Sequence, residues 1–107
     1  MADGYDETAP ARDEVDAWTG AAVLEFGADW CPHCQAAQPL VADALAAVPG
    51  VRRVKVADGK GKPLGRSFAV KLWPTLVFLK DGKEVSRVVR PSDADDVRRG
   101  LEAIAAA

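Results

Sequence analysis

Two cysteines three positions apart are the residues of this sequence best suited to covalent chemistry. Cys31 and Cys34 lie in the stretch Trp30-Cys31-Pro32-His33-Cys34, and the 107-residue chain contains two cysteines and one histidine in all. Thiols at this spacing lie one turn apart on the same face of a helix, where they can form and break a disulfide with each other. The motif therefore predicts thiol–disulfide exchange.

The flanking residues predict different environments for the two thiols. Proline is favoured at the first helical position because its missing N–H has no partner there, so a helix beginning at Pro32 places Cys31 at the N-cap. The free N–H groups and the positive end of that helix stabilise a thiolate. We expect an exposed, ionisable Cys31 and a sheltered Cys34, because Cys34 lies on the apolar stripe of the helix. That stripe contains Ala37, Val41, Leu45 and Val48.

A zinc site and a structural disulfide are poor alternatives for the two thiols. A structural zinc ion requires four ligands, and the sequence adds only His33, which points away from its neighbours on a helix. A bond between residues so close in sequence cannot hold distant parts of a fold together. Idle thiols remain an alternative. We expect no metal and no organic cofactor.

The elements around the motif alternate between strands and helices. The short apolar run at 21–27 predicts a buried strand, and helical periodicity predicts a helix at 32–48, ended by Pro49-Gly50. A capping box is expected at 92–95. The same periodicities and a turn at 80–83 predict helices at 12–18 and 64–70, strands at 51–57, 75–79 and 84–89, and a final helix that buries Val97, Leu101 and Ile104.

This order predicts an α/β protein with a mixed central sheet of four to five strands and helices on both faces. The first two strands are joined through a long helix and should be parallel, whereas the last two form a hairpin and must be antiparallel. We expect a flexible segment at 1–11, disordered or a poor edge strand, followed by a single domain at 12–107.

Composition limits the partners and the compartment. The chain is 49% hydrophobic and 28% charged, with a net charge of −2, so no broad attraction to nucleic acid or membranes is expected. No apolar run is long enough to span a membrane. The acidic start lacks the pattern of a signal peptide, which favours the cytoplasm. A periplasmic protein that has lost its signal is the alternative.

Several stretches together resemble the thioredoxin family, from about residue 12 to the end. They are residues 25–34, Pro39, Trp73-Pro74-Thr75, Lys80-Asp81-Gly82 and the final helix. The resemblance implies a thioredoxin-like fold in which Cys31 is the nucleophile and Cys34 resolves the mixed disulfide. It also implies protein disulfide substrates, a reductase or other dithiol electron donor, and a monomer.

Glu25 stands where the family has a buried aspartate, beneath the helix that carries the cysteines. A carboxylate isolated in a core has a raised pKa and could act as the base that deprotonates Cys34. The alternatives are a carboxylate that reaches past the strand edge or one paired with Lys55 or Arg53. The family also has a lysine near this aspartate. We expect Val54 at the position of that lysine, with Lys55 at the next position in the sequence.

The resemblance also defines a substrate groove. Trp73-Pro74-Thr75 matches the family's cis-proline loop, whose residue before the proline offers backbone groups to an extended substrate; a trans proline that opens a strand is the alternative. Trp73 replaces a smaller aliphatic residue and is expected to restrict or redirect the groove. Arg90 replaces a glycine and either selects acidic substrates or lies along the surface. Trp30 either flanks the nucleophile and helps to tune its redox behaviour, or simply packs.

The residues between the cysteines bear on the direction of electron flow. Reducing thioredoxins have Gly-Pro there, whereas Pro32-His33 resembles strongly oxidising disulfide donors, because a histidine stabilises the thiolate more than a glycine does. We expect an intermediate potential and a protein-disulfide reductase. The alternatives are an oxidase or isomerase in an oxidising compartment, or a binding module that uses the Trp73 and Arg90 groove and has incidental thiols.

Overall fold

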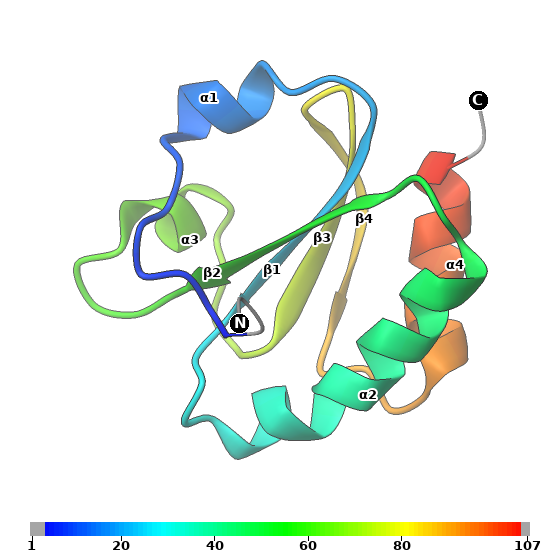
Figure 1. Cartoon of the computed structure of the whole chain (residues 1–107). Helices are drawn as coiled ribbons and strands as arrows, with labels where there is room; N and C mark the ends of the chain where they lie inside the picture. Colours follow the sequence, from blue (N-terminus) through cyan, green and yellow to red (C-terminus); the bar gives the residue numbers. More distant parts are fainter. Residues whose placement is uncertain (1–3, 106–107) are drawn as a thin grey trace.

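The computed structural model describes residues 4–105 and confirms the predicted order of elements (Figure 1). Strand β1 leads into the cysteine motif and α2 leads out of it. The bounds are α1 Arg12–Asp16, β1 Ala21–Gly27, α2 Pro32–Ala47, β2 Arg52–Ala57, α3 Pro63–Ser67, β3 Thr75–Lys80, β4 Lys83–Val89 and α4 Ala94–Ala105.

The sheet has four strands in the order β2-β1-β3-β4. As predicted, β1 pairs with β2 in parallel and β3 pairs with β4 antiparallel, while β1 and β3 are also antiparallel. Strand β1 is therefore central, with a neighbour on each side. In this register Glu25 of β1 lies opposite Lys55 of β2 and Leu76 of β3.

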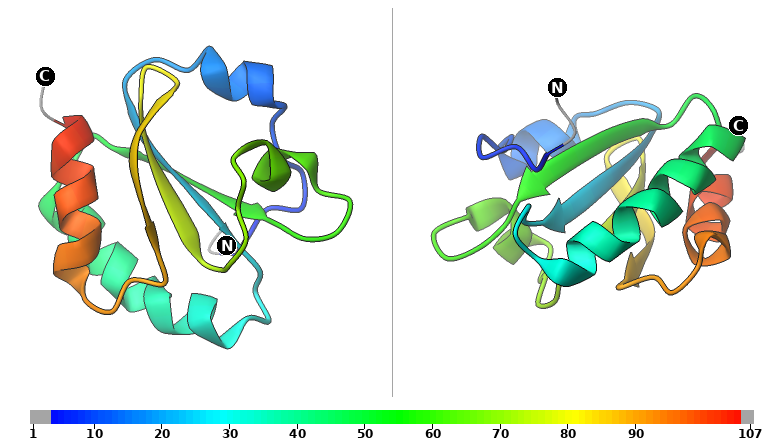
Figure 2. Two further views of the ribbon diagram at one scale, coloured as in Figure 1. Left: turned by 180° about the vertical axis from the view of Figure 1, so that it is seen from behind. Right: turned by 60° about the horizontal axis from the view of Figure 1, so that its bottom comes forward.

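Helices cover both faces of the sheet, α1 and α3 on one side and α2 and α4 on the other (Figure 2). The alternation of strand side chains assigns Leu24 and Phe26 to the first face and Val23 to the second. Glu25 follows Val23 by two positions and therefore faces α2. Helix α4 comes so close to the sheet that a methyl group at Gly100 would overlap the ring of Phe78.

The start of α4 differs by one residue from the predicted capping box. The Asp93 carboxylate accepts a hydrogen bond from the backbone N–H of Asp96 at 3.0 Å. The Asp96 carboxylate in turn accepts one from the N–H of Ser92 at 3.1 Å. The box therefore uses Asp93 and Asp96 rather than Ser92 and Asp95, because the chain enters the helix one residue later.

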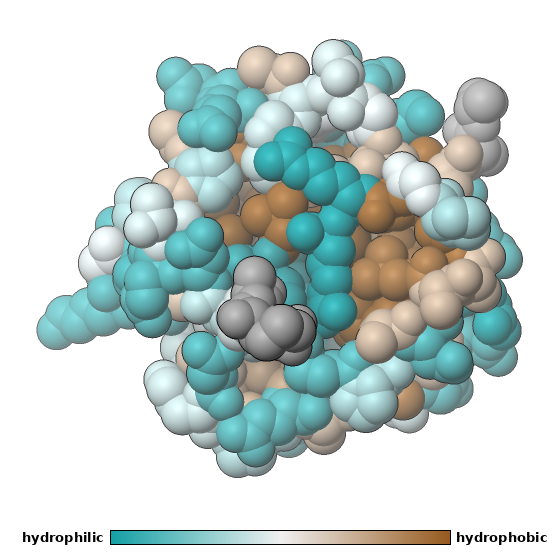
Figure 3. Space-filling view, in the orientation of Figure 1, coloured by the Kyte–Doolittle hydropathy of each residue, from teal (hydrophilic) through white to brown (hydrophobic). Residues whose placement is uncertain are grey.

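Polar side chains gather across the middle of one face of the molecule, over β1 and β2, with apolar areas on either side (Figure 3). The side chains of β2 account for part of this pattern, since Arg52 is exposed while Arg53 and Lys55 are half-buried. Strand β2 is the edge of the sheet, and polar residues suit an edge that meets water.

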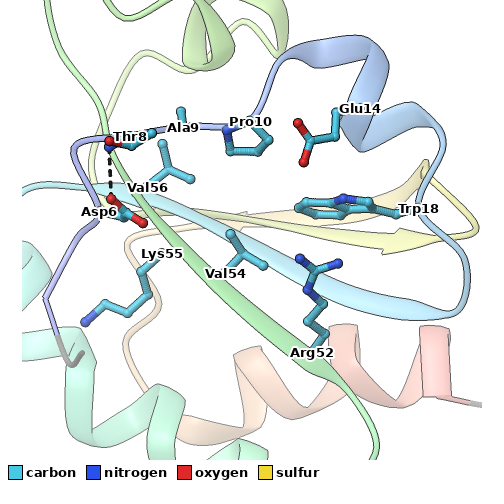
Figure 4. Close-up of a pocket in the computed structure, with 10 residues that line it drawn as sticks. All are labelled: Asp6, Thr8, Ala9, Pro10, Glu14, Trp18, Arg52, Val54, Lys55 and Val56. Carbon is cyan, nitrogen blue, oxygen red and sulfur yellow. Dashed lines mark hydrogen bonds between the residues drawn. The ribbon is translucent and has the colours of Figure 1, made fainter. Parts of the chain in front are cut away.

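The described part of the N-terminal segment runs beside β2 (Figure 4). Asp6 N–H donates to the Lys55 carbonyl at 3.0 Å, and Asp6 accepts from Ala57 N–H at 2.9 Å, which forms one parallel bridge. Tyr5 of this segment is buried. At the start of β2, the Arg52 guanidinium lies 4.3 Å above the ring of Trp18. Residues 4–10 thus form a short addition to the sheet edge, while the domain boundary after residue 11 stays a prediction.

Candidate functional site

The two thiols lie where the sequence predicts, at the start of α2. Cys31 is the N-cap residue, and its Sγ accepts a hydrogen bond from Cys34 N–H at 3.3 Å. Both cysteines are free thiols. The expectation of an exposed Cys31 is wrong: its exposed fraction is 5%, against 1% for Cys34. Tyr5, Ala28, Ala57 and the half-buried Trp73 pack around the pair and cover Cys31.

Hydrogen bonds, rather than exposure, distinguish the two thiols. Burial raises the pKa of Cys31, but hydrogen bonds from the Cys34 thiol and from the backbone N–H groups of Cys34 and His33, together with the charge of Arg90, lower it below its ordinary value overall. Burial and the neighbouring Cys31 sulfur raise the pKa of Cys34 to about 11. Cys31 is therefore the thiol that ionises first.

The loop before β3 faces the cysteines, and its Trp73–Pro74 peptide bond is cis, as predicted. The Trp73 indole N–H donates to the Asp58 carboxylate at 2.9 Å. Its ring packs edge-on against Trp30, with the centroids 5.6 Å apart. Trp30 is 73% exposed, so the two rings form an apolar surface beside Cys31. Thr75 is buried, and its hydroxyl donates to the Leu72 carbonyl at 2.6 Å.

Arg90 does not lie loosely along the surface. Its Nε–H donates to the Trp73 carbonyl at 2.8 Å, and its backbone N–H donates to the Pro74 carbonyl at 2.9 Å. Its φ of 51° is in the left-handed region, which a glycine adopts without steric strain. Arg90 thus holds the cis-proline loop and places a positive charge near Cys31.

Glu25 is fully buried but it is not isolated. Its Oε1 accepts hydrogen bonds from Arg53 Nε at 3.0 Å and Nη2 at 2.8 Å, so both nitrogens of this ion pair donate to one oxygen. Its Oε2 accepts from the Tyr5 hydroxyl at 2.5 Å and from Gln38 Nε2 at 2.9 Å. The paired alternative is therefore the one that the structure adopts.

Gln38 of α2 connects this carboxylate to the helix and to β2. Its Nε2 also donates to the Cys34 carbonyl at 3.0 Å, while its Oε1 accepts from Arg53 at 2.9 Å and from Lys55 at 2.6 Å. Lys55 extends toward α2, away from Val54 and Val56 (Figure 4). The expectation that Val54 stands beside Glu25 is wrong, because the register places Lys55 opposite it.

Tyr5, Gln38 and Asp58 are site residues that sequence reasoning missed. Gln38 follows Cys34 by four positions on α2, so helical spacing alone could have indicated it. Asp58 directly follows β2. Tyr5 belongs to the N-terminal segment, and no periodicity connects it to the motif. Pro32 and His33 are exposed at the first turn of α2.

Within residues 4–105, no group of three or more His, Cys, Asp or Glu side chains is arranged to hold a metal ion. None of the helices in this range is both long and apolar enough to cross a membrane.

Comparison with known proteins gives consistent matches. The sequence model of the thioredoxin family matches residues 7–103. Thioredoxin H-type 1 of Nicotiana tabacum is 42% identical over 67 residues, which are 63% of this chain and 53% of the tobacco protein. A thioredoxin of Chlamydia caviae is 36% identical over 81 residues, which are 76% of this chain and 79% of that protein.

Solved structures agree over a larger part of the chain. Thioredoxin 2 from Pseudomonas aeruginosa PAO1 in its reduced form is 54% identical, with a TM-score of 0.88 over 98% of this chain and 97% of that one. The chain thus spans about half the length of the tobacco relative and nearly all of the Pseudomonas chain.

The fold and the dithiol at the start of α2, facing a cis-proline loop, define a thiol–disulfide oxidoreductase. The matches identify which kind. This chain belongs to the thioredoxin family.

The different acidities of the thiols predict ordered alkylation. At pH 7 about one Cys34 in 10⁴ is ionised, given its pKa of about 11. Iodoacetamide should therefore label Cys31 first in the reduced protein, and labelling should begin below the pH range of an ordinary thiol. Mass spectrometry of protein quenched between pH 5 and 9 checks this. Labelling of Cys34 before Cys31 would contradict the assignment.

Proposed function

We propose that this protein reduces the disulfides of other proteins, with Cys31 as the nucleophile and Cys34 as the resolving thiol. The observation that carries the proposal is the opposite displacement of the two thiol pKa values at the N-terminus of one helix. A nucleophile must be a thiolate at neutral pH, whereas a resolving thiol should stay protonated until the mixed disulfide has formed.

The reaction has two exchange steps. The Cys31 thiolate attacks one sulfur of the target disulfide, and the other target sulfur leaves as a thiolate. Cys34 then loses its proton and attacks Cys31, which releases the second target thiolate and leaves a Cys31–Cys34 disulfide. The target gains two electrons, and the dithiol loses two. Glu25, buried beneath α2, is the proposed final acceptor of the Cys34 proton.

Each turnover leaves the protein oxidised, so an electron donor must restore the dithiol. We propose a reductase or another dithiol protein in this role, which makes the protein part of an electron transport chain that maintains cell redox homeostasis. The chain has no cysteines beyond the redox pair, which suits a reducing compartment such as the cytoplasm. We propose that it works there as a monomer.

The reductase function is tested by insulin reduction and by trapping of intermediates. The wild type should reduce insulin with dithiothreitol as donor, and Cys31→Ser should lower the rate to that of dithiothreitol alone, because the nucleophile is lost. Cys34→Ser should form a stable mixed disulfide with insulin, visible on a non-reducing gel. Wild-type insulin reduction no faster than dithiothreitol would favour a binding module with incidental thiols.

We propose that Pro32 and His33 set an intermediate reduction potential. Both are exposed beside the N-cap thiol, and the backbone N–H of His33 helps to lower the pKa of Cys31. A more stable thiolate makes the disulfide a stronger oxidant.

Replacement of Pro32-His33 by Gly-Pro should therefore make the potential more negative. A change of about 30 mV corresponds to about 1.4 kcal/mol for this two-electron couple. Equilibration with glutathione buffers measures the potential, and the Cys31 pKa should rise in parallel. An unchanged potential would mean that partners, rather than His33, set the direction of electron flow.

We propose that Trp30, Trp73, Pro74, Thr75 and Arg90 form the substrate groove and that Arg90 favours acidic substrates. Trp30 and Trp73 offer the apolar surface, while the cis-proline loop offers backbone groups to an extended chain. The Trp73 carbonyl already accepts from Arg90, but a carbonyl oxygen has a second lone pair for a substrate N–H. The guanidinium then lies where acidic side chains of the substrate pass.

Two disulfide peptides that differ only in Glu or Lys beside the cysteine test this selectivity. Arg90→Ala should lower kcat/KM for the acidic peptide about two- to fivefold more than for the basic one, since exposed ion pairs contribute up to about 1 kcal/mol. Arg90 also affects the Cys31 pKa, but that effect is the same for both peptides and cancels in the ratio of their kcat/KM values. Lys83→Ala, at the opposite end of β4, removes the same charge and should leave the ratio unchanged. Equal losses for both peptides after Arg90→Ala would exclude the proposed selection.

A further inference from the structure

The hydroxyl of Tyr5 lies between the buried carboxylate and the resolving cysteine. It donates to Glu25 Oε2 at 2.5 Å, and Tyr5 packs with Cys34 in one buried cluster, where its hydroxyl lowers the pKa of the Cys34 thiol. An added Cβ at Gly27 would lie 2.6 Å from Cys34 Sγ and 2.8 Å from Cζ of Tyr5, so both side chains approach the same backbone position. The absence of a side chain at Gly27 leaves room for the phenol and the thiol.

We propose that Tyr5 relays the proton of Cys34 to Glu25 during the resolving step. The inference rests on the proposed role of Glu25 as the final proton acceptor, and it adds the path. Three observations support it: Tyr5 is 6% exposed, Glu25 is 0% exposed and Cys34 is 1% exposed, so bulk water reaches none of them readily. In addition, the structure gives a hydrogen bond from the phenol to the carboxylate.

The relay moves two protons and leaves the tyrosine neutral. The Cys34 S–H bond breaks as its proton passes to Oη of Tyr5, and the Tyr5 O–H proton passes to Oε2 of Glu25. The electron pair left on Cys34 attacks Cys31 and breaks its bond to the target sulfur, which leaves as a thiolate. Reduction of the Cys31–Cys34 disulfide later reverses the transfer and returns the proton to Cys34.

Charged groups around Tyr5 favour this neutral relay over a phenolate. The Glu25 carboxylate lies on one side and the Cys34 and Cys31 sulfurs on another, while Asp29 accepts from the Tyr5 backbone N–H at 2.9 Å. Lys55 Nζ lies 4.6 Å from the centre of the ring. Burial, then Glu25 and Cys34, raise the pKa of Tyr5.

The two oxygens of Glu25 have separate partners, which makes Oε2 the receiving atom. Arg53 binds Oε1 through both Nε and Nη2 and keeps that oxygen fixed. Oε2 faces Tyr5 and Gln38 instead. A proton on Oε2 neutralises the carboxylate and ends the ion pair, but Arg53 can keep its two hydrogen bonds to Oε1.

The test measures the resolving step alone. Cys31 is first loaded as a mixed disulfide with thionitrobenzoate, and the release of thionitrobenzoate by Cys34 is followed by stopped-flow absorbance from pH 6 to pH 10. Tyr5→Phe keeps the ring and removes the hydroxyl, and Glu25→Gln removes the acceptor. Thermal unfolding shows that each variant is folded, and Glu25→Gln/Arg53→Gln replaces Glu25→Gln if the unpaired Arg53 destabilises the single variant.

We expect Tyr5→Phe to slow release at least about tenfold at pH 7, because a positioned acid–base group contributes about 10²–10⁴-fold. The variant must wait for solvent to remove the Cys34 proton, so its rate should rise about tenfold per pH unit toward the Cys34 pKa of about 11. Glu25→Gln should give the same profile, and the double variant should be no slower than either single variant.

Asp6→Ala is the matched control. It removes the hydrogen bond from Thr8 N–H to the Asp6 carboxylate at 2.9 Å and so loosens the same segment without touching the phenol (Figure 4). Its release rate should match the wild type.

The other outcomes each have one meaning. Normal release by Tyr5→Phe with slow release by Glu25→Gln would overturn the relay and keep Glu25 as a direct acceptor. Normal release by both variants would overturn the role of Glu25 as well, while insulin reduction still reports the dithiol chemistry. Slow release by Asp6→Ala with an unchanged pH profile would mean that Tyr5 acts only by anchoring its segment.

Discussion

The ion pair between Glu25 and Arg53 is the constraint on which the site depends. A carboxylate in the central strand of a small sheet is costly to bury unless a cation and hydrogen bonds replace its water. Arg53 supplies the cation from the neighbouring strand, while Tyr5 and Gln38 supply the remaining donors. These partners come from β2, the N-terminal segment and α2. One buried charge therefore holds together three parts of the chain around the resolving cysteine.

The nucleophile depends on a different set of interactions. Cys31 is nearly as buried as Cys34, so exposure cannot distinguish them. The helix N-terminus directs N–H groups at Cys31, and Arg90 adds a charge from the far side of the groove. Arg90 is held there by the Trp73 carbonyl. The cis-proline loop and the residue that helps to lower the pKa of Cys31 are thus one connected unit.

Local patterns predicted the elements and the dithiol, whereas pairing between elements set the environment of Glu25. The apolar run of β1 and the periodicity of α2 were sufficient to place Cys31 at the N-cap, whereas the position of Glu25 beneath the helix was predicted from the family resemblance. The partner of Glu25 depends on the register of β1 and β2, and a shift by one residue exchanges Lys55 for Val54 on that face. Tyr5 belongs to a segment with little apolar content, so only the folded structure reveals its place beside Cys34. The exposure of Cys31 was likewise set by packing from distant residues.

The geometry around Glu25 reconciles two demands that conflict on a single carboxylate. Stability requires that a buried charge be firmly paired, yet a firmly paired carboxylate binds a proton poorly. Here the demands fall on different oxygens: Arg53 binds Oε1, whereas the neutral donors Tyr5 and Gln38 bind Oε2. Protonation of Oε2 makes Glu25 neutral and removes its charge attraction to Arg53, but the two Arg53 hydrogen bonds to Oε1 need not break, so the guanidinium keeps an acceptor. The N-terminal segment is then more than an edge addition to the sheet, because it contributes the hydroxyl through which the proton travels.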